Sequence, residues 1–417
     1  MKRVPTTRQA NALRSMSSRL ASLPFLVLSV ATCGQSSVTP DGAVVLASSD
    51  VHVLGTSESV ALVRDLEVLP DGSVWLLNSV EPFFVGFHAN GSLIGRHGAS
   101  GGGPEEFRMP AGLLTGGLNG EAWAFDYVRH AFIRVSNPDA EWSEFAIPPD
   151  VVPPGTVRGG MNIMSPTVRT ARLGEEIVFP WTTGSMDSGI SAFWMAILAA
   201  DIAALDPRTG VVRHVVSLGD VLDDPSAGFV ATDGGFPLWY RLWAVCGDQL
   251  RVYDRVRNQF RGFTASGEEV AAIELPPVRL TEVTPQEFAR AVFPLRQAEV
   301  TGAVGTRLSA EDSVRVLNQI AQGLDGTPRQ LAAYLPRYVD FRCSSDSALW
   351  LHPIDLEIGA LKGGRQWLRI TPDGAAREVL LPVGFDALRF TRERIWGVQR
   401  DELDVASVAW IALPTGL

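Results

Sequence analysis

Hydrophobic and polar residues alternate along most of the chain in short runs that end in turn residues, which is typical of β-strands. The segment "PDGSVWLLNSVEPFFVGFHANG", residues 70–91, shows one unit as turn, strand, polar loop, strand and turn. Its Asp71-Gly72 and Asn90-Gly91 pairs are hairpin signals. The pattern predicts an all-β fold.

The same unit recurs along the chain at a regular spacing. Trp75 and Trp123 are 48 residues apart in equivalent positions, and Trp350 and Trp396 are 46 residues apart. Six such units of four short strands predict a six-bladed β-propeller, in which radial packing buries both faces of every sheet. Other copies and fragments of the unit lie at residues 118–135, 175–181, 204–216, 246–263, 346–353, 367–374 and 394–399.

A propeller ring closes when one sheet contains strands from both ends of the chain. We expect Val51–Leu54 to supply the outer strand of the last blade, whose other strands come from residues 385–413. This closure would remove the last open sheet edge.

The glycine-rich stretch "GRHGASGGGPEEFRMP", residues 95–110, allows two interpretations. A phosphate-binding loop needs a lysine after its glycines, or a helix after a strand, and neither follows here. Glycines let the chain reverse direction, Phe107 can fill the apolar seam between two blades, and Pro110 can end the loop. The stretch is therefore interpreted as a linker between blades.

Residues 95–135 also resemble the glycine–GPxEF–proline linker and the Asp-bearing hairpin of NHL-type six-bladed β-propellers, which are common among exported bacterial proteins. The resemblance is clear over 66–135 and 243–267, fair over 338–411 and poor between 149 and 233. It implies the propeller architecture and no particular reaction, because such propellers include ligand binders, interaction scaffolds and enzymes.

One late segment, Thr281–Leu335, departs from the β pattern. Capping signatures begin at Thr284, Ser309 and Thr327, and apolar residues follow at helical spacing. They predict a helical insertion, residues 281–335, that lies against one mouth of the ring. Its apolar stripes either pack on the propeller or form a groove for a partner, and a helical lid would satisfy both.

A second insertion, Thr182–Ala200, contains the apolar run Phe193–Leu198. This run is either a buried strand or an exposed hydrophobic patch. Burial is the expectation, because large exposed apolar patches are rare without a partner.

The first 33 residues have the order of a bacterial export signal. Four arginines precede an apolar run that is too short for a membrane span, and Cys33 follows small residues. The end of this segment resembles a lipobox, which implies lipidation of Cys33, and ordinary cleavage after Ala31 is the alternative. The chain is thus divided into a lipoprotein-type signal peptide (1–33), a linker (34–50) and the propeller (51–417).

Composition narrows the partners. The chain is 46% hydrophobic and 20% charged, which provides for a large core. Its net charge is −10 and its pI is about 5.2. An acidic balance of this kind argues against nucleic acid and against an anionic membrane surface as partners.

Linear motifs assign no chemistry. Serine nucleophile elbows and EF-hand loops are missing from the sequence. Zinc-binding spacing is also missing among the histidines. Catalytic and metal-binding residues therefore stay unknown. The histidines are His52, His88, His97, His130, His214 and His352.

Two Asp–Arg pairs are candidates for catalytic acid–base pairs: Asp126 with Arg129, and Asp254 with Arg257. Their recurrence at equivalent repeat positions favours a structural role, in which each carboxylate accepts backbone N–H groups of its hairpin loop.

An aromatic group, Trp239, Tyr240 and Trp243, flanks one predicted inner strand. These side chains are interpreted as core rather than as a carbohydrate platform.

The remaining cysteines, Cys246 and Cys343, would form an even pair in an oxidising compartment. Equivalent positions on facing sheets are about 10 Å apart, whereas a disulfide needs Cα atoms within about 7 Å. We therefore expect two free, largely buried thiols.

The leading hypothesis is an exported scaffold that binds a protein, peptide or glycan through one face of the ring, without a cofactor. The alternative is a propeller hydrolase or lyase with a Ca²⁺ or Zn²⁺ ion at the central channel, held by residues of different blades. A monomer is expected, lipid-anchored in the cell envelope or periplasmic or secreted, and touching a membrane only through the N-terminal lipid.

Overall fold

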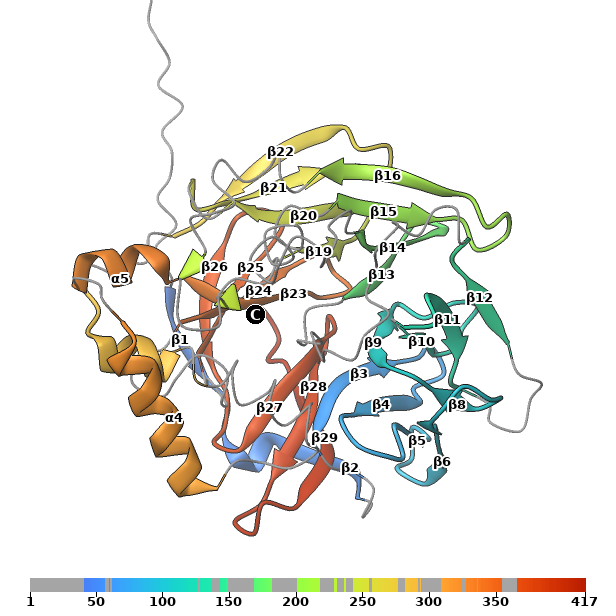
Figure 1. Ribbon diagram of the computed structural model, residues 1–417, viewed down its shortest axis with the longest axis horizontal. Coiled ribbons are helices and arrows are strands. Elements are labelled where there is room, and N and C mark those ends of the chain that lie inside the picture. The colour runs from blue at the N-terminus through green and yellow to red at the C-terminus, as the bar shows by residue number, and fades with distance from the viewer. Residues whose placement is uncertain are drawn as a thin grey trace, which may run out of the picture. The chain divides into compact units, whose positions relative to one another are not determined.

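Antiparallel strands dominate the structure, a computed structural model (Figure 1). Most strands belong to meanders in which neighbours in the chain are hydrogen-bonded neighbours in the sheet. The structure describes residues 41–417 except 57–59, 61, 127, 137–142, 149–168, 182–200, 218–228, 231–235, 238–242, 255–256, 277–281, 292, 294–308, 325–327, 336 and 355–365.

Four separate sheets of four or five strands are present among the described residues. The first contains β3 (Val63–Val68), β4 (Val74–Asn78), β5 (Phe84–Phe87) and β6 (Leu93–His97). The second contains β19 (Trp243–Cys246), β20 (Gln249–Asp254), β21 (Gln259–Phe263) and β22 (Glu269–Glu274). The third contains β23 (Tyr338–Cys343), β24 (Leu349–Pro353), β25 (Gln366–Ile370), β26 (Ala376–Leu380) and β1 (Asp41–Val45). The fourth contains β27 (Phe385–Phe390), β28 (Arg394–Arg400), β29 (Ala406–Ala412) and β2 (Val51–Thr56).

An eight-stranded sheet joins two further meanders. One consists of β9 (Pro110–Thr115), β10 (Trp123–Asp126), β11 (Ala131–Arg134) and β12 (Glu144–Ala146), and the other of β13 (Thr170–Leu173), β14 (Glu176–Trp181), β15 (Asp201–Leu205) and β16 (Val212–Ser217). The two meet where β9 and β13 pair in parallel. Two-stranded pairs are formed by β7 (Ala99–Ser100) with β8 (Glu106–Phe107) and by β17 (Phe229–Val230) with β18 (Phe236–Pro237).

Successive meanders pack face to face around a common centre (Figure 1). A cluster of buried apolar side chains lies between each meander and the next, and the last cluster joins the sheet of β27 to the sheet of β3. This arrangement is a β-propeller, as the sequence predicts. Because β9 and β13 merge two meanders into one sheet, the count of six blades stays a prediction at this point.

The expected ring closure is confirmed. β2 pairs antiparallel with β29, so a strand from the start of the propeller completes the sheet formed by the end of the chain. The interpretation of residues 34–50 as a linker is wrong in part, because Asp41–Val45 forms β1, which pairs in parallel with β26.

The repeat alignment is also confirmed for four tryptophans. Trp75, Trp123, Trp350 and Trp396 lie on β4, β10, β24 and β28, the second strand of their meanders, and all four are buried. Each fills the apolar cluster against a neighbouring meander.

The stretch at residues 95–110 is a linker, as expected. Phe107 is buried in the cluster between the first two meanders, with its ring centroid 4.7 Å from that of Phe84. Glu106 turns back and accepts the backbone N–H of Gly103 at 2.7 Å. The glycines therefore shape a reversal that carries Phe107 into the seam.

The late insertion is helical where it is described. Residues 285–291 are helical, and α4 (Ala310–Gln322) and α5 (Pro328–Tyr334) follow. Thr284 and Glu287 form the predicted capping box, and the Ser309 hydroxyl accepts the N–H of Asp312. A short 3₁₀ helix, Ser48–Asp50, is the other described helix.

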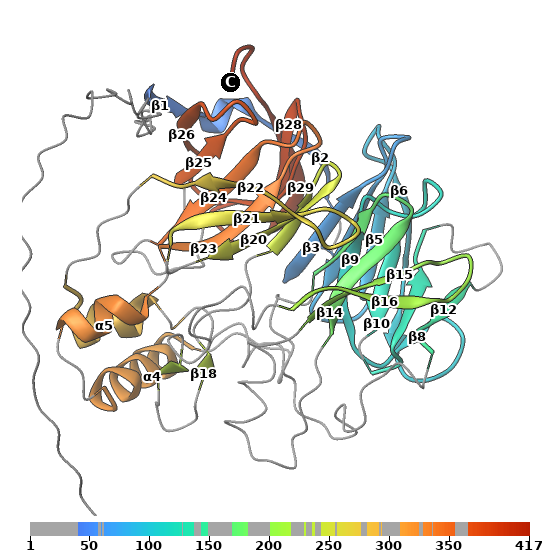
Figure 2. The same ribbon diagram turned by 90° about the horizontal axis from the view of Figure 1, so that it is seen from above.

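The apolar side chains of the insertion pack mainly on one another. Phe288 and Leu331 form a cluster with Ile354, the residue that follows β24. Figure 2 shows α4 and α5 at one side of the strands. A position over the channel mouth stays a prediction.

The expectation of two free thiols is wrong. Cys246 and Cys343 form a disulfide with a Cα–Cα distance of 5.2 Å. The two cysteines end β19 and β23, the innermost strands of neighbouring sheets. The sheets of a propeller fan out from its centre, so their innermost strands lie much closer together than two stacked sheets do.

Three regions named in the sequence analysis lie outside the described residues: 1–33 with Cys33, 182–200, and Trp239 with Tyr240. Trp243, by contrast, is fully buried in the core between two meanders, as expected. Within the described part of the chain, no helix combines the length and the apolar character needed to cross a membrane.

Candidate functional site

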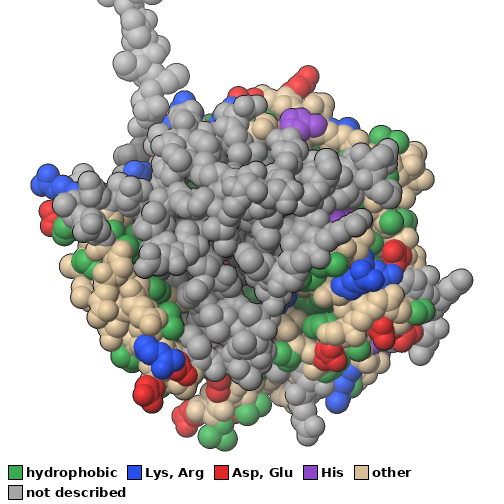
Figure 3. All heavy atoms as spheres, in the orientation of Figure 1, with side chains coloured by type: hydrophobic (Ala, Val, Ile, Leu, Met, Phe, Trp, Pro, Cys, Tyr) green, Lys and Arg blue, Asp and Glu red, His purple; other side chains and the backbone are tan. Residues whose placement is uncertain are grey.

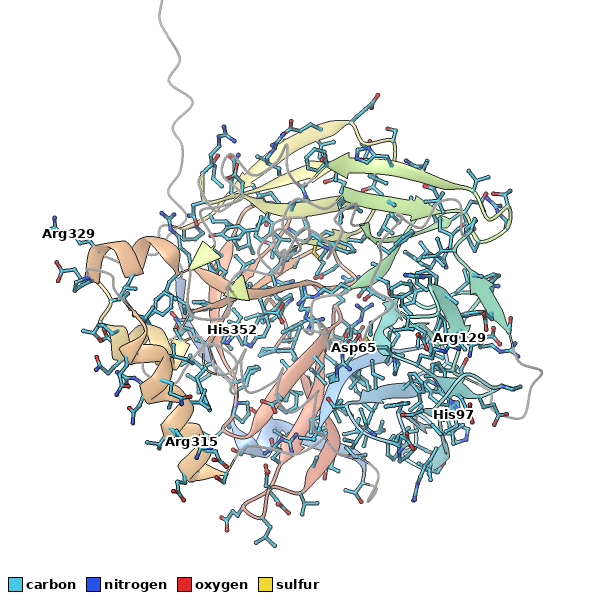
Figure 4. All side chains as sticks on the ribbon, viewed as in Figure 1. Asp65, His97, Arg129, Arg315, Arg329 and His352 are labelled. Carbon is cyan, nitrogen blue, oxygen red and sulfur yellow. A yellow bond between two sulfur atoms is a disulfide. The ribbon has the colours of Figure 1, made fainter. Side chains whose placement is uncertain are left out.

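Charged side chains gather on the innermost strands of the propeller. We call the set formed by Asp65, Glu67, Arg169, Asp340, Arg342 and Arg389 the inner-strand cluster. The acidic pair on β3 and the Asp–Arg pair on β23 alternate with buried apolar residues such as Leu66 and Phe341. In Figure 4, Asp65 lies toward the centre of the sheets, whereas Arg129 and Arg315 lie at the outside.

Asp340 is shared by two arginines. Arg169, one residue before β13, donates from its guanidinium to Asp340 Oδ1 and to the carbonyl of Phe341. Arg342 donates from Nε to Asp340 Oδ2 at 3.2 Å. Burial would raise the pKa of Asp340, but the charges of Arg169 and Arg342 outweigh it and hold the pKa below its ordinary value.

Glu67 connects three innermost strands. The residue is 2% exposed, and its Oε1 accepts the N–H of Gly116, which follows β9, at 3.1 Å. The same atom accepts from Arg389 Nη2 on β27 at 3.3 Å. Burial raises the pKa of Glu67 to about 7, despite the opposing effect of Arg389.

The remaining contacts involve the first residues of β9, which do not pair with β13. Asp65 Oδ2 accepts the N–H of Leu113 at 2.9 Å. Arg64 donates to the carbonyls of Pro110 and Ala111, both at 3.4 Å. The first residues of β3 therefore hold the innermost strand of the next meander through side-chain bonds, where backbone pairing between the two is missing.

The histidines do not converge. His52 stacks on Trp410, His97 on Trp75, and His352 on Trp367. His88 and His130 stand at hairpin turns. Among the residues that the structure describes, no group of three or more His, Cys, Asp or Glu side chains could hold a metal ion.

The recurring Asp–Arg pairs have the structural role expected of them. Asp126 is fully buried and accepts the backbone N–H groups of Val128 and Arg129, and Asp254 accepts that of Arg257. The guanidinium of Arg257 also donates to Asp254 at 3.0 Å.

Sequence motifs missed the inner-strand cluster because its members come from separate meanders. One pattern could have pointed to it. Charged residues at alternate positions of a strand that is covered on both faces, as in "VRDLEV" and "YVDFRC", have to find partners near the propeller centre.

Comparisons with known proteins concern the fold alone. No family model matches the sequence, and no curated protein matches it. Virginiamycin B lyase from Staphylococcus aureus is 13% identical, with 88% of this chain and 89% of that one covered and a TM-score of 0.37. A gluconolactonase from Xanthomonas campestris is 10% identical, with 87% and 89% covered and a TM-score of 0.41. A member of the DUF4221 family from Bacteroides vulgatus is 9% identical, with 90% and 97% covered and a TM-score of 0.49.

Glu67→Gln is expected to flatten part of the pH dependence of stability. The pKa of Glu67 is about 7 in the folded chain against an ordinary 4.5, so the folded state holds the proton more tightly. Its contribution to stability is fully present below pH 4.5 and is lost as the pH rises through 7. Between pH 5 and pH 8 the wild type should lose about 2–3 kcal/mol that the variant does not lose. Urea unfolding at both pH values measures this, and identical profiles would show that the pKa of Glu67 is not raised.

Proposed function

We propose that this chain is an exported propeller scaffold of the NHL type, which binds a protein, peptide or glycan through one face of its ring without catalysis. The observation that carries the proposal is the inner-strand cluster. Its guanidinium and carboxylate groups come from several meanders, and the side chains of Arg169, Arg342 and Arg389 are about one-fifth exposed. Partly exposed, directional donors at the centre of a rigid ring suit ligand recognition.

Six blades are proposed for the ring, with the eight-stranded sheet counted as two. The apolar clusters between successive meanders support this count. The innermost strands support it as well, because they contact one another in the order β3, β9, β13, β19, β23, β27 and again β3. The parallel pairing of β9 with β13 is then a contact between the inner strands of two neighbouring blades.

Export is proposed on two grounds. A disulfide such as Cys246–Cys343 is typical of an oxidising compartment. The basic and apolar N-terminal segment that ends at Cys33 has the order of an export signal. Lipidation of Cys33 would tether the monomer to the envelope, and the protein would need no other membrane contact.

The described surface favours selective binding over non-specific electrostatic binding. Acidic and basic side chains lie side by side on the described part of the face drawn in Figure 3. The net charge of −10 gives long-range attraction for cations only, so recognition of other ligands would depend on local contacts at the ring.

A binding screen with a footprint tests the scaffold function. The purified protein is presented to peptide and glycan arrays, and each binder is followed by hydrogen exchange. We expect at least one binder that protects amides of the innermost strands β3, β23 and β27. Binders that protect only outer strands, or no binder of any class, would contradict the proposal. Conversion of the ligand that stops when divalent metal is removed would establish the hydrolase or lyase alternative in its place.

A further inference from the structure

Arg342 and Arg169 are two cations that share one hydrogen-bonded carboxylate. Both guanidinium groups are directed at the single carboxylate of Asp340. Burial lowers the pKa of Arg169, and the charge of Arg342 lowers it further. Two cations that share one carboxylate repel each other. The negative charge of Asp65 also acts on Arg169, and an anion bound at Arg342 would relieve the repulsion further.

Arg342 also has unused donors of the right geometry. A guanidinium carries five N–H donors in a planar fork. In the described structure Arg342 uses only Nε, on Asp340. That bond orients the guanidinium plane and leaves the two terminal nitrogens available to donate to a ligand. The side chain is 21% exposed. A fork held in this way matches the two oxygens of a carboxylate.

We propose that Arg342, together with Arg169, binds a carboxylate group of an acidic peptide at the centre of the ring. This inference rests on the proposed scaffold function and names its ligand class. A carboxylate carries one negative charge and two acceptor oxygens, which match the two terminal nitrogens of the Arg342 guanidinium, whereas a phosphate group carries between one and two charges.

A peptide is favoured over an acidic glycan because the described tryptophans offer no open ring face. Trp410 is the least buried of them, and it is covered by His52 at 4.2 Å and by Arg394 at 4.1 Å between centres. Recognition of a sugar would call for such a face. The other described tryptophans with characterised side chains are buried: Trp75, Trp123, Trp243, Trp350, Trp367 and Trp396.

Non-specific attraction cannot produce the binding that we expect. The protein carries a net charge of −10, so an acidic peptide is repelled by the molecule as a whole. Affinity for such a peptide therefore has to come from a local site.

The test uses the whole protein and a fluorescein-labelled oligoglutamate peptide, with fluorescence anisotropy as the readout. We expect Arg342→Gln to weaken binding roughly ten- to hundredfold, and Arg342→Lys to recover only part of it because an ammonium is not a fork. The matched control is Arg315→Gln on α4, whose guanidinium is bound to Asp312, three residues earlier on the same helix and away from the inner-strand cluster (Figure 4). This control should bind like the wild type.

A second variant gives the opposite sign. Asp340→Asn removes the competing carboxylate from both arginines, so it should tighten oligoglutamate binding severalfold. If Arg342 and Asp340 only stabilise the fold, both Arg342→Gln and Asp340→Asn should weaken oligoglutamate binding. If Arg342→Gln does not fold, the Lys and Asn variants still decide the question, since one must weaken and the other must strengthen binding.

Other probes separate the possible failures. Oligoglutamine of the same length should not bind. Equal binding of oligogalacturonate with the same Arg342 dependence would overturn the assignment to a peptide, and competition by inorganic phosphate at equal concentration would overturn the preference for carboxylate. If neutral peptides or neutral glycans bind with an inner-strand footprint while oligoglutamate does not, this inference fails and the scaffold function stands. If nothing binds, both fail.

Discussion

Removal of the disulfide by the double substitution Cys246→Ala and Cys343→Ala is expected to lower the free energy of unfolding by about 4–5 kcal/mol. The two cysteines are 97 positions apart in the sequence. The bond therefore closes a long loop, and in the chain-entropy account a long loop restricts the unfolded chain most. This loop contains the helical insertion and β23. Without the bond, a large part of the unfolded chain therefore gains conformational freedom.

Chemical denaturation of the oxidised wild type and of the double variant measures the difference. Reduction of the wild type with dithiothreitol should destabilise it by a similar amount, while the same treatment should leave the variant unchanged. In a Cys33→Ser background, the denatured and non-reduced protein should take up no alkylating reagent at all. Alkylation of two thiols, or equal stability of the two proteins, would show that the bond is missing.

Strand order and repeat positions could be predicted from the sequence because they depend on local patterns. The tryptophans of the second strands and the turn residues around them recur at a regular spacing, and each strand needs only its own neighbours to form. The helix caps at Thr284 and Ser309 could also be predicted from the sequence, because a cap involves residues three positions apart.

Features that depend on ring geometry could not be predicted in the same way. Cys246 and Cys343 lie at the centre of a fan of sheets, where the spacing of about 10 Å between stacked sheets does not hold. Arg169, which precedes β13, and its partner Asp340 on β23 are 171 positions apart in the sequence, and Arg169 lies in a region with poor repeat similarity. The strand Asp41–Val45 cannot be predicted from the sequence, because five residues show no repeat pattern and form a strand only on the edge that β26 provides.

The sequence did predict the structural role of the aspartates that end the second strands. Asp126 accepts the most backbone N–H groups of these, so its role can be tested. Asp126 accepts four backbone N–H groups, two from its own hairpin and two from the linker, at Arg108 (2.7 Å) and Met109 (3.3 Å). It therefore fastens the glycine-rich linker to β10.

We expect Asp126→Asn to lower the free energy of unfolding by about 3–5 kcal/mol. The amide nitrogen of Asn cannot accept a hydrogen bond, so the backbone N–H donors that face it would lose their partner inside the protein. Each hydrogen bond to a charged acceptor contributes about 1.5–3 kcal/mol. The matched control is Asp71→Asn in an exposed hairpin turn, where the carboxylate serves only Ser73 and a change of about 1 kcal/mol or less is expected. Urea unfolding gives both values, and hydrogen exchange gives the local effect: the amide of Arg108 should lose protection in the Asp126 variant and keep it in the Asp71 variant. Equal destabilisation by the two substitutions, or an unchanged Arg108 amide, would contradict the role of Asp126 as the residue that holds the linker.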